Sequence, residues 1–143
     1  MSTRDTDVLL VEDQPTDAEL VLRVLWRVLH RERVLWVRDG QQALEHLQAL
    51  ASRPGAALPR LVLLDLKLPR VSGFEVASQI RAQPVFCGVP LVILSSSADA
   101  SDIARAWRCG VNSYVVKPVA LDELQAAVLQ LAAYWLDLNR AGG

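Results

Sequence analysis

The chain has 143 residues, and its 15 basic and 16 acidic side chains give a formal net charge of −1. Hydrophobic residues make up 52% of the sequence and charged residues 22%, a balance typical of a globular domain and not of a disordered segment. The length suits a single domain with a real core, and the lack of a basic block argues against a dedicated nucleic-acid surface. No apolar run approaches the ~18 residues that a membrane-spanning helix needs.

The N-terminus, MSTRDTDV, is polar and carries no signal-peptide pattern, so we expect a cytoplasmic protein. Cys87 and Cys109 have neither a CxxC spacing nor a histidine cluster beside them. In that compartment the sequence predicts two buried free thiols and neither a disulfide nor a metal site.

Short apolar runs recur along the chain and predict strands. They are VLLVE (8–12), VLWV (34–37), LVLLD (61–65), LVILS (91–95) and SYVV (113–116). Their apolar character is continuous and does not alternate, which is typical of strands that are covered on both faces.

Helical patterns separate these runs. TDAELVLRVLWRVL opens with a capping-box spacing from Thr16 to Glu19, and GQQALEHLQAL, GFEVASQIRA and DIARAWRCG follow. The last helix has the longest apolar stripe, formed by Leu121, Leu124, Val128, Leu131 and Trp135. Repeated strand–helix alternation predicts a doubly wound α/β fold: a five-stranded parallel sheet of flavodoxin-like order 2-1-3-4-5 with helices on both faces.

Polar side chains follow four of the five predicted strands. Glu12 and Asp13 end the first, Asp65 ends the third, Ser95 ends the fourth, and Lys117 follows the fifth. In doubly wound sheets, ligands bind beyond the carboxyl ends of the strands. We therefore expect three carboxylates, a hydroxyl and an ammonium to converge at one edge of the sheet.

Three clustered carboxylates need a compensating charge. Two unit charges ~4 Å apart repel by roughly 4 kcal/mol at a protein-like dielectric, so three imply on the order of 10 kcal/mol. Lys117 offsets only part of this repulsion. Mg²⁺ offsets more, since it prefers one or two carboxylates together with waters and a phosphate. The cluster therefore predicts both Mg²⁺ and a phosphoryl group.

These side chains suit phosphoryl transfer. A carboxylate oxygen can attack phosphorus and hold the phosphoryl group as an acyl phosphate. Mg²⁺ and Lys117 neutralise the charge on the phosphoryl oxygens, and Ser95 offers a hydroxyl donor to the bound phosphate.

The same residues could instead have structural roles. Asp65 could cap the following helix, but Pro69 and Gly73 intervene and the cap fits poorly. Glu12 and Asp13 could cap the first helix. Taken together with a lysine, the three carboxylates favour a functional site, because clusters of perturbed charges concentrate at such sites.

Four motifs, in this order, resemble a two-component response-regulator receiver domain. They are LLVEDQPTD, LLDLKLPRVSGFE, VPLVILSSS and GVNSYVVKP, and the resemblance extends from about residue 7 to residue 132. It implies that Asp65 accepts a phosphoryl group from a sensor histidine kinase. It implies further that Asp13, Asp65 and the backbone carbonyl of Lys67 bind Mg²⁺, with Glu12 acting mostly through water.

The same resemblance implies how the phosphate is sensed. Lys117 is the phosphate contact, Ser95 and Tyr114 form the switch pair, and the Lys117–Pro118 bond is cis. Ser95 stands where threonine is commoner in the family and Ser96 where alanine or glycine is usual, so the lifetime of the phosphate is not predicted.

The pattern predicts a single receiver domain over residues 1–143, with its core at about 7–132 and a C-terminal helix extension at about 133–140. The chain stops soon after the last predicted helix, so we expect no attached output domain. VNSYVVKPV and LAAYWLDLN resemble the small stand-alone regulators that serve phytochrome-type light-sensing kinases, which implies a bacterial phytochrome as partner.

The predicted activity is that of a phosphoacceptor, not an enzyme, with self-phosphorylation from small donors and self-dephosphorylation. An aspartyl-phosphate phosphatase needs a second carboxylate two residues after the nucleophile, where this chain has Lys67. A degenerate receiver that only binds proteins does not need the phosphorylation residues. Their presence here argues against that function: Glu12, Asp13, Asp65, Ser95 and Lys117. A phosphorelay shuttle and a phosphate sink remain alternatives.

Apolar residues that the core does not need predict an interface. Trp107 lies beside Arg105 and Arg108, and Tyr134, Leu136 and Leu138 cannot all share one helix face. We therefore expect a homodimer through the fourth helix, the fifth strand, the fifth helix and the C-terminal tail, and neither a nucleic-acid nor a membrane partner. The alternative is a monomer whose tail folds over the sheet edge.

Overall fold

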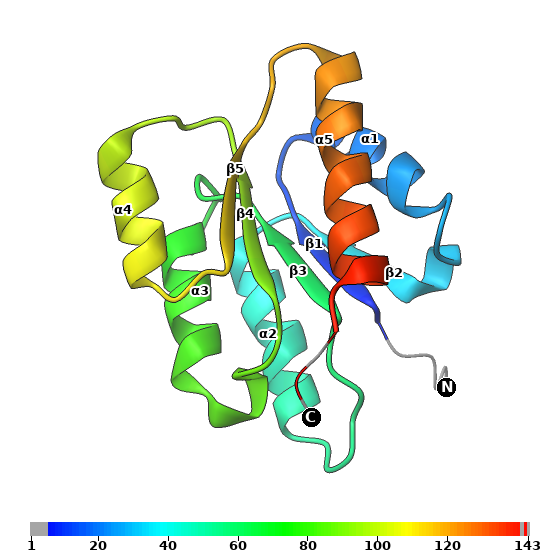
Figure 1. The fold of residues 1–143 in the computed structure, drawn as a ribbon. Helices are drawn as coiled ribbons and strands as arrows, with labels where there is room; N and C mark the ends of the chain where they lie inside the picture. The colour runs from blue at the N-terminus through cyan, green and yellow to red at the C-terminus, as the bar shows by residue number, and fades with distance from the viewer. Residues whose placement is uncertain (1–5, 141, 143) are drawn as a thin grey trace.

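The computed structural model describes residues 6–140 and 142, so most of the polar N-terminal segment lies outside the described residues. Its strands are β1 (Val8–Val11), β2 (Val34–Val37), β3 (Leu61–Leu64), β4 (Leu91–Ser95) and β5 (Ser113–Val116). They form one parallel sheet in the order β2-β1-β3-β4-β5, which confirms the predicted topology (Figure 1).

Helices cover both faces of this sheet. They are α1 (Pro15–Leu25), α2 (Gly40–Ala51), α3 (Gly73–Ala82), α4 (Ala100–Arg108) and α5 (Leu121–Ala133), and a π-helical turn, Tyr134–Leu138, extends α5. Figure 1 shows α1 and α5 together on one face and α2 with α3 on the other, while α4 lies beside β5. Short 3₁₀ turns at Arg31–Arg33 and Pro84–Phe86 precede β2 and β4.

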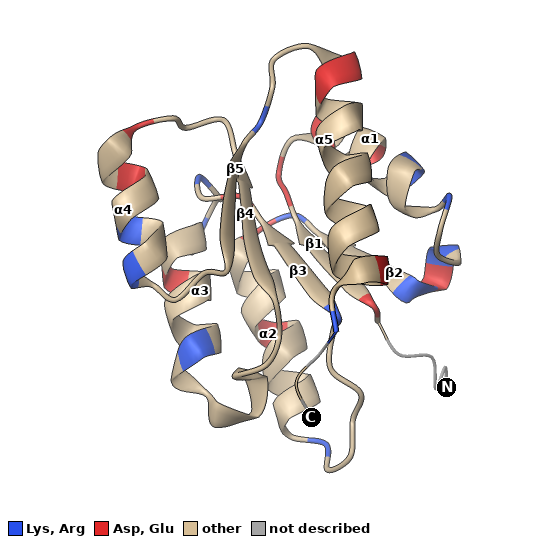
Figure 2. Cartoon of the chain, in the orientation of Figure 1, with Lys and Arg blue, Asp and Glu red and all other residues tan. Residues whose placement is uncertain are grey.

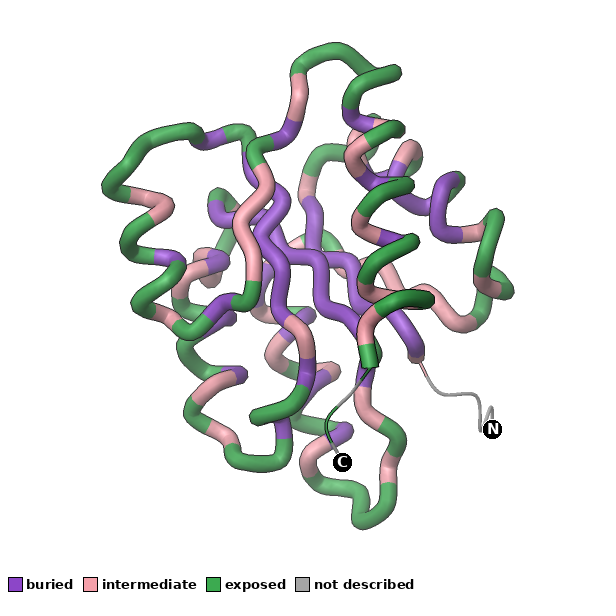
Figure 3. The backbone as a smooth tube through the Cα atoms, viewed as in Figure 1, coloured by how far each residue is buried: buried purple, intermediate pink, exposed green. Residues whose placement is uncertain are grey.

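The two faces of the sheet bury separate apolar cores. Alternate residues of β1 show the division: Leu9 and Val11 pack toward α2 and α3, whereas Val8 and Leu10 pack toward α1 and α5. All of β1, β3 and β4 is buried, as Figure 3 shows for the centre of the sheet. This two-sided burial explains why these three strands are continuously apolar. The edge strands β2 and β5 were predicted to be covered as well, but they are only partly buried.

Several local predictions need correction. The predicted capping box from Thr16 to Glu19 is wrong, because α1 begins one residue before Thr16, at Pro15, and its N-cap is Gln14. The fixed φ of proline suits the first helical position. The predicted core stripe of α5 includes Leu121, yet this side chain is 52% exposed, at the first residue of the helix. Both cysteines are free, as predicted, but Cys87 is exposed in a turn and Cys109 is only half-buried at the end of α4.

The charges on α4 follow the helix dipole. Asp102 lies in its first turn and Arg105 and Arg108 in its last, an order that Figure 2 shows along the helix.

Within the described residues, no helix is long and apolar enough to cross a membrane.

Candidate functional site

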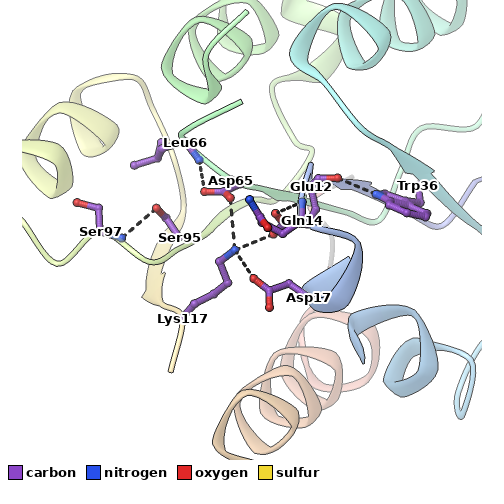
Figure 4. Close-up of polar contacts among 9 residues, drawn as sticks. All are labelled: Glu12, Gln14, Asp17, Trp36, Asp65, Leu66, Ser95, Ser97 and Lys117. Atoms are coloured by element: carbon purple, nitrogen blue, oxygen red, sulfur yellow. Dashed lines mark hydrogen bonds and ion pairs between the residues drawn. The ribbon is translucent and has the colours of Figure 1, made fainter. Parts of the chain in front are cut away.

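The predicted polar residues meet at the carboxyl edge of the sheet. Glu12 follows β1, Asp65 follows β3 and Lys117 follows β5, and all three are buried. The Lys117 Nζ atom lies 2.9 Å from Glu12 Oε1 and 3.4 Å from Asp65 Oδ2 (Figure 4). The structure therefore brings these two carboxylates and the ammonium together, as predicted.

Three carboxylates form a candidate metal centre. Oxygen atoms of Glu12, Asp13 and Asp65 lie within 4.8 Å of one another. Asp13 is partly buried, whereas the other two residues are buried. An all-oxygen set of this kind fits a hard divalent cation. Lys67, whose backbone carbonyl was predicted to join the set, is exposed in the loop after β3.

Asp65 is not a helix cap. Ser72 caps α3, because its Oγ accepts a hydrogen bond from the Glu75 amide. Asp65 Oδ1 instead accepts from the Leu66 amide at 2.7 Å, which fixes the carboxylate at the strand end. Gly73 lets α3 approach it closely, since a Cβ there would lie 2.1 Å from the Asp65 carbonyl oxygen.

Burial perturbs the ionisation of the site. It raises the pKa of Glu12 to about 7, with the charge of Asp65 adding to the effect and Lys117 opposing it. Burial alone lowers the pKa of Lys117, but hydrogen bonds to Glu12 and Asp17 and the charge of Asp65 outweigh it and raise that pKa. Lys117 therefore stays charged, while Glu12 changes its charge near neutral pH.

Asp17 is a fourth carboxylate at this site, and sequence reasoning missed it. It lies in the first turn of α1, and its Oδ2 is 2.9 Å from Lys117 Nζ (Figure 4). No spacing rule links it to Asp13, because Asp13 precedes α1, and an acidic residue in the first helical turn is an ordinary helix start.

The predicted switch pair is joined through a third residue. Ser95 is buried, and its Oγ accepts from the Ser97 amide at 3.2 Å. The Tyr114 hydroxyl donates to the Ser97 carbonyl at 2.8 Å, and the Ser97 hydroxyl donates to Asp102 on α4 at 2.7 Å. Ser97 thus connects the end of β4 with β5 and α4.

The implied cis bond is absent. No peptide bond in the described part of the chain is cis, so Lys117–Pro118 is trans, the form that is intrinsically favoured by about 0.5–1 kcal/mol. With the bond trans, the Lys117 amide donates to the Ser95 carbonyl at 2.7 Å and its ammonium still reaches the carboxylates.

Comparison with known proteins decides the family. Residues 8–129 match the model of the response regulator receiver domain. The chain belongs to this family. This match confirms the predicted family, and the strand order confirms the predicted fold. Receiver domains accept phosphoryl groups from sensor histidine kinases and act in signalling.

Two similar proteins match this receiver over most of their own length. The probable methanogenesis regulatory protein FilR2 of Methanothrix harundinacea is 42% identical over 95% of this chain and 87% of its own. Response regulator Rcp1 of Synechocystis is 33% identical over 91% of this chain and 88% of its own.

Solved structures show the same fold. The phosphorylated cyanobacterial phytochrome response regulator RcpA aligns with a TM-score of 0.88 at 31% identity, over 98% of this chain and all of RcpA. The Mn²⁺-bound form of Rcp1 aligns with a TM-score of 0.83 at 31% identity, over 95% and 98% of the two chains. The acidic cluster of Glu12, Asp13 and Asp65 is consistent with the divalent-metal binding that is typical of receivers.

Proposed function

We propose that this receiver takes a phosphoryl group from a histidine kinase onto Asp65 and thereby changes a protein-interaction surface. The observation that carries the proposal is a buried Asp65 that shares its site with Lys117 and two more carboxylates. A buried acidic cluster is costly unless it is used or neutralised, and phosphoryl transfer uses every member of it.

The transfer is a displacement at phosphorus. A carboxylate oxygen of Asp65 attacks the phosphorus of a phosphohistidine; the new P–O bond forms as the P–N bond breaks, and the electron pair stays on the imidazole nitrogen. The Lys117 ammonium, 3.4 Å from Asp65 Oδ2, neutralises oxygen charge on the transferring group. Mg²⁺ held by Glu12, Asp13, Asp65 and the Lys67 carbonyl would supply further neutralisation.

Signal output starts at Ser95 in this proposal. Its hydroxyl oxygen now accepts from the Ser97 amide, and its proton is available to donate to a phosphate on Asp65. Movement of Ser95 toward the phosphate alters the Ser97 contacts on which the Tyr114 hydroxyl depends. The phosphate would thus bias a two-state equilibrium between β4 and β5.

The proposed partners follow from the same resemblance. The donor is a sensor histidine kinase of the phytochrome type, because RcpA is a phytochrome response regulator and matches this chain end to end. We propose further that the protein acts in the cytoplasm, where a kinase that uses ATP would phosphorylate it. We also propose a single receiver domain over residues 1–143, with residues 133–140 as its C-terminal extension.

Labelling by a small phosphoryl donor tests the proposal. With Mg²⁺ and phosphoramidate, intact-mass measurement should show one added phosphate on the wild type and none on Asp65→Asn. Asp122→Asn, which changes an exposed aspartate on α5, is the matched control and should label like the wild type. Chelating the metal should block labelling. Equal labelling of wild type and Asp65→Asn would refute the acceptor assignment.

A further inference from the structure

Lys117 has no spare hydrogen-bond donor. An ammonium carries three N–H groups and no acceptor. Its Nζ contacts three carboxylates: Glu12 at 2.9 Å, Asp17 at 2.9 Å and Asp65 at 3.4 Å. The ammonium therefore lies closer to Glu12 and Asp17 than to Asp65, and each N–H has one carboxylate to face (Figure 4).

These three carboxylates have different further duties. Glu12 and Asp65 belong to the acidic cluster that fits a divalent cation, and Asp17 does not. The Asp65 carboxylate is consumed when it becomes an acyl phosphate, and the negative charge then lies on the phosphoryl oxygens. Of these three partners, only Asp17 takes part neither in the acidic cluster nor in the proposed bond to phosphorus.

The backbone that carries Asp17 is firmly held. The next residue, Ala18, is buried, and so is Val21 one turn later, so the first turns of α1 pack against the sheet. The Asp17 side chain itself is 27% exposed, which places its ion pair with Lys117 at the rim of the site. A rigid helix thus presents a carboxylate to the end of a flexible four-carbon side chain.

We propose that Asp17 is a positioning residue for Lys117. Asp17 holds one N–H of the ammonium against α1. A second N–H, which faces Asp65, is then aimed at the incoming phosphoryl group. Glu12, the third partner, is meanwhile engaged at the metal centre. The inference rests on the proposed phosphoryl transfer and deepens it. The competing account is that Asp17 merely adds negative charge, which would repel an anionic donor.

The two accounts predict opposite kinetics for Asp17→Ala. Loss of the anchor should lower the maximal rate of phosphorylation by phosphoramidate about tenfold, the effect expected from one lost charge-assisted hydrogen bond, without raising the half-saturating donor concentration. Asp17→Asn keeps an oxygen acceptor and should recover part of the rate. Glu19→Ala removes an exposed carboxylate of the same helix, paired with Arg23, and should behave like the wild type.

A second readout does not depend on phosphorylation. In nitrogen-15 spectra of the metal-free protein, the Lys117 ammonium should give a slowly exchanging signal in the wild type and in Glu19→Ala, and lose it in Asp17→Ala. An unchanged maximal rate, a faster one, or a retained ammonium signal in Asp17→Ala would overturn the inference. Wild-type protein that takes no phosphate would instead refute the proposed function, and the ammonium signal would then decide whether Asp17 holds Lys117.

Discussion

Burial sets the chemistry of individual residues at this site. Glu12 is 2% exposed and has a pKa near neutrality, whereas Asp13, the next residue, is only partly buried. The strand-end carboxylates were predictable because parallel strands end at one edge of the sheet. Asp17 was not, because it reaches the site from a helix, and its sequence neighbours favour an ordinary helix start.

Metal affinity should depend on pH through Glu12. Its pKa is raised from 4.5 to about 7, so below pH 7 the metal-free site holds a proton that a cation must displace. Mg²⁺ affinity should therefore rise roughly tenfold from pH 6 to pH 8, with proton release on binding. Trp36, whose Nε1 donates to the Glu12 carbonyl, offers a fluorescence reporter for the titration.

Glu12→Gln is the control for this titration, since it should bind Mg²⁺ with little pH dependence over the same range. Equal wild-type affinities at pH 6 and pH 8 would contradict the assigned role of Glu12.

At the scale of elements, the loop between β4 and α4 is the connection that matters. Ser97 contacts Ser95, Tyr114 and Asp102, and thus joins β4, β5 and α4. Sequence reasoning could name Ser95 and Tyr114 by family resemblance. It could not find Ser97, because two of these bonds use its backbone amide and carbonyl, which every residue other than proline provides.

Ser95→Ala should separate phosphate acceptance from signal transmission. The variant keeps Asp65 and Lys117, so it should still take phosphate, but it lacks the hydroxyl that couples the phosphate to Ser97. Amide spectra of the phosphorylated variant should therefore show much smaller shifts in β4 and β5 than the wild type. Ser96→Ala, at the exposed neighbouring position, is the control. Identical shifts in wild type and Ser95→Ala would rule out this coupling.

For the whole molecule, the sheet and its two cores were predictable because both-sided burial leaves continuous apolar strands. The course of the tail was not, since Tyr134–Leu138 divides its side chains between two environments. Trp135 and Leu136 pack on the core, whereas Tyr134 is 49% and Leu138 69% exposed. Trp107 on α4 is also 50% exposed. Part of the tail therefore completes the core, and apolar surface is left over on the tail and on α4.

We expect this surface to form a homodimer through α4, β5, α5 and the tail, since exposed aromatic residues rimmed by arginine favour interfaces. Light scattering across a dilution series should show a dimer for the wild type and a shift toward monomer for Trp107→Ala and Leu138→Ala. Point variants suit this test because truncation at Ala133 would uncover the core under Trp135. Gln48→Ala, at an exposed position on α2 on the opposite face of the sheet from α5, should remain dimeric. A monomeric wild type at tens of micromolar, phosphorylated or not, would exclude the dimer.

The most direct test of the account is the identity of the acceptor residue. Borohydride reduces an aspartyl phosphate to homoserine, and trypsin should release residues 61–67, LVLLDLK, in which Asp65 is the only carboxylate side chain. After phosphorylation and reduction, peptide mass spectrometry should find homoserine at position 65 in that peptide. Homoserine in the peptide of residues 5–23, which carries Glu12, Asp13 and Asp17, or its absence from residues 61–67 of a phosphorylated protein, would contradict the account.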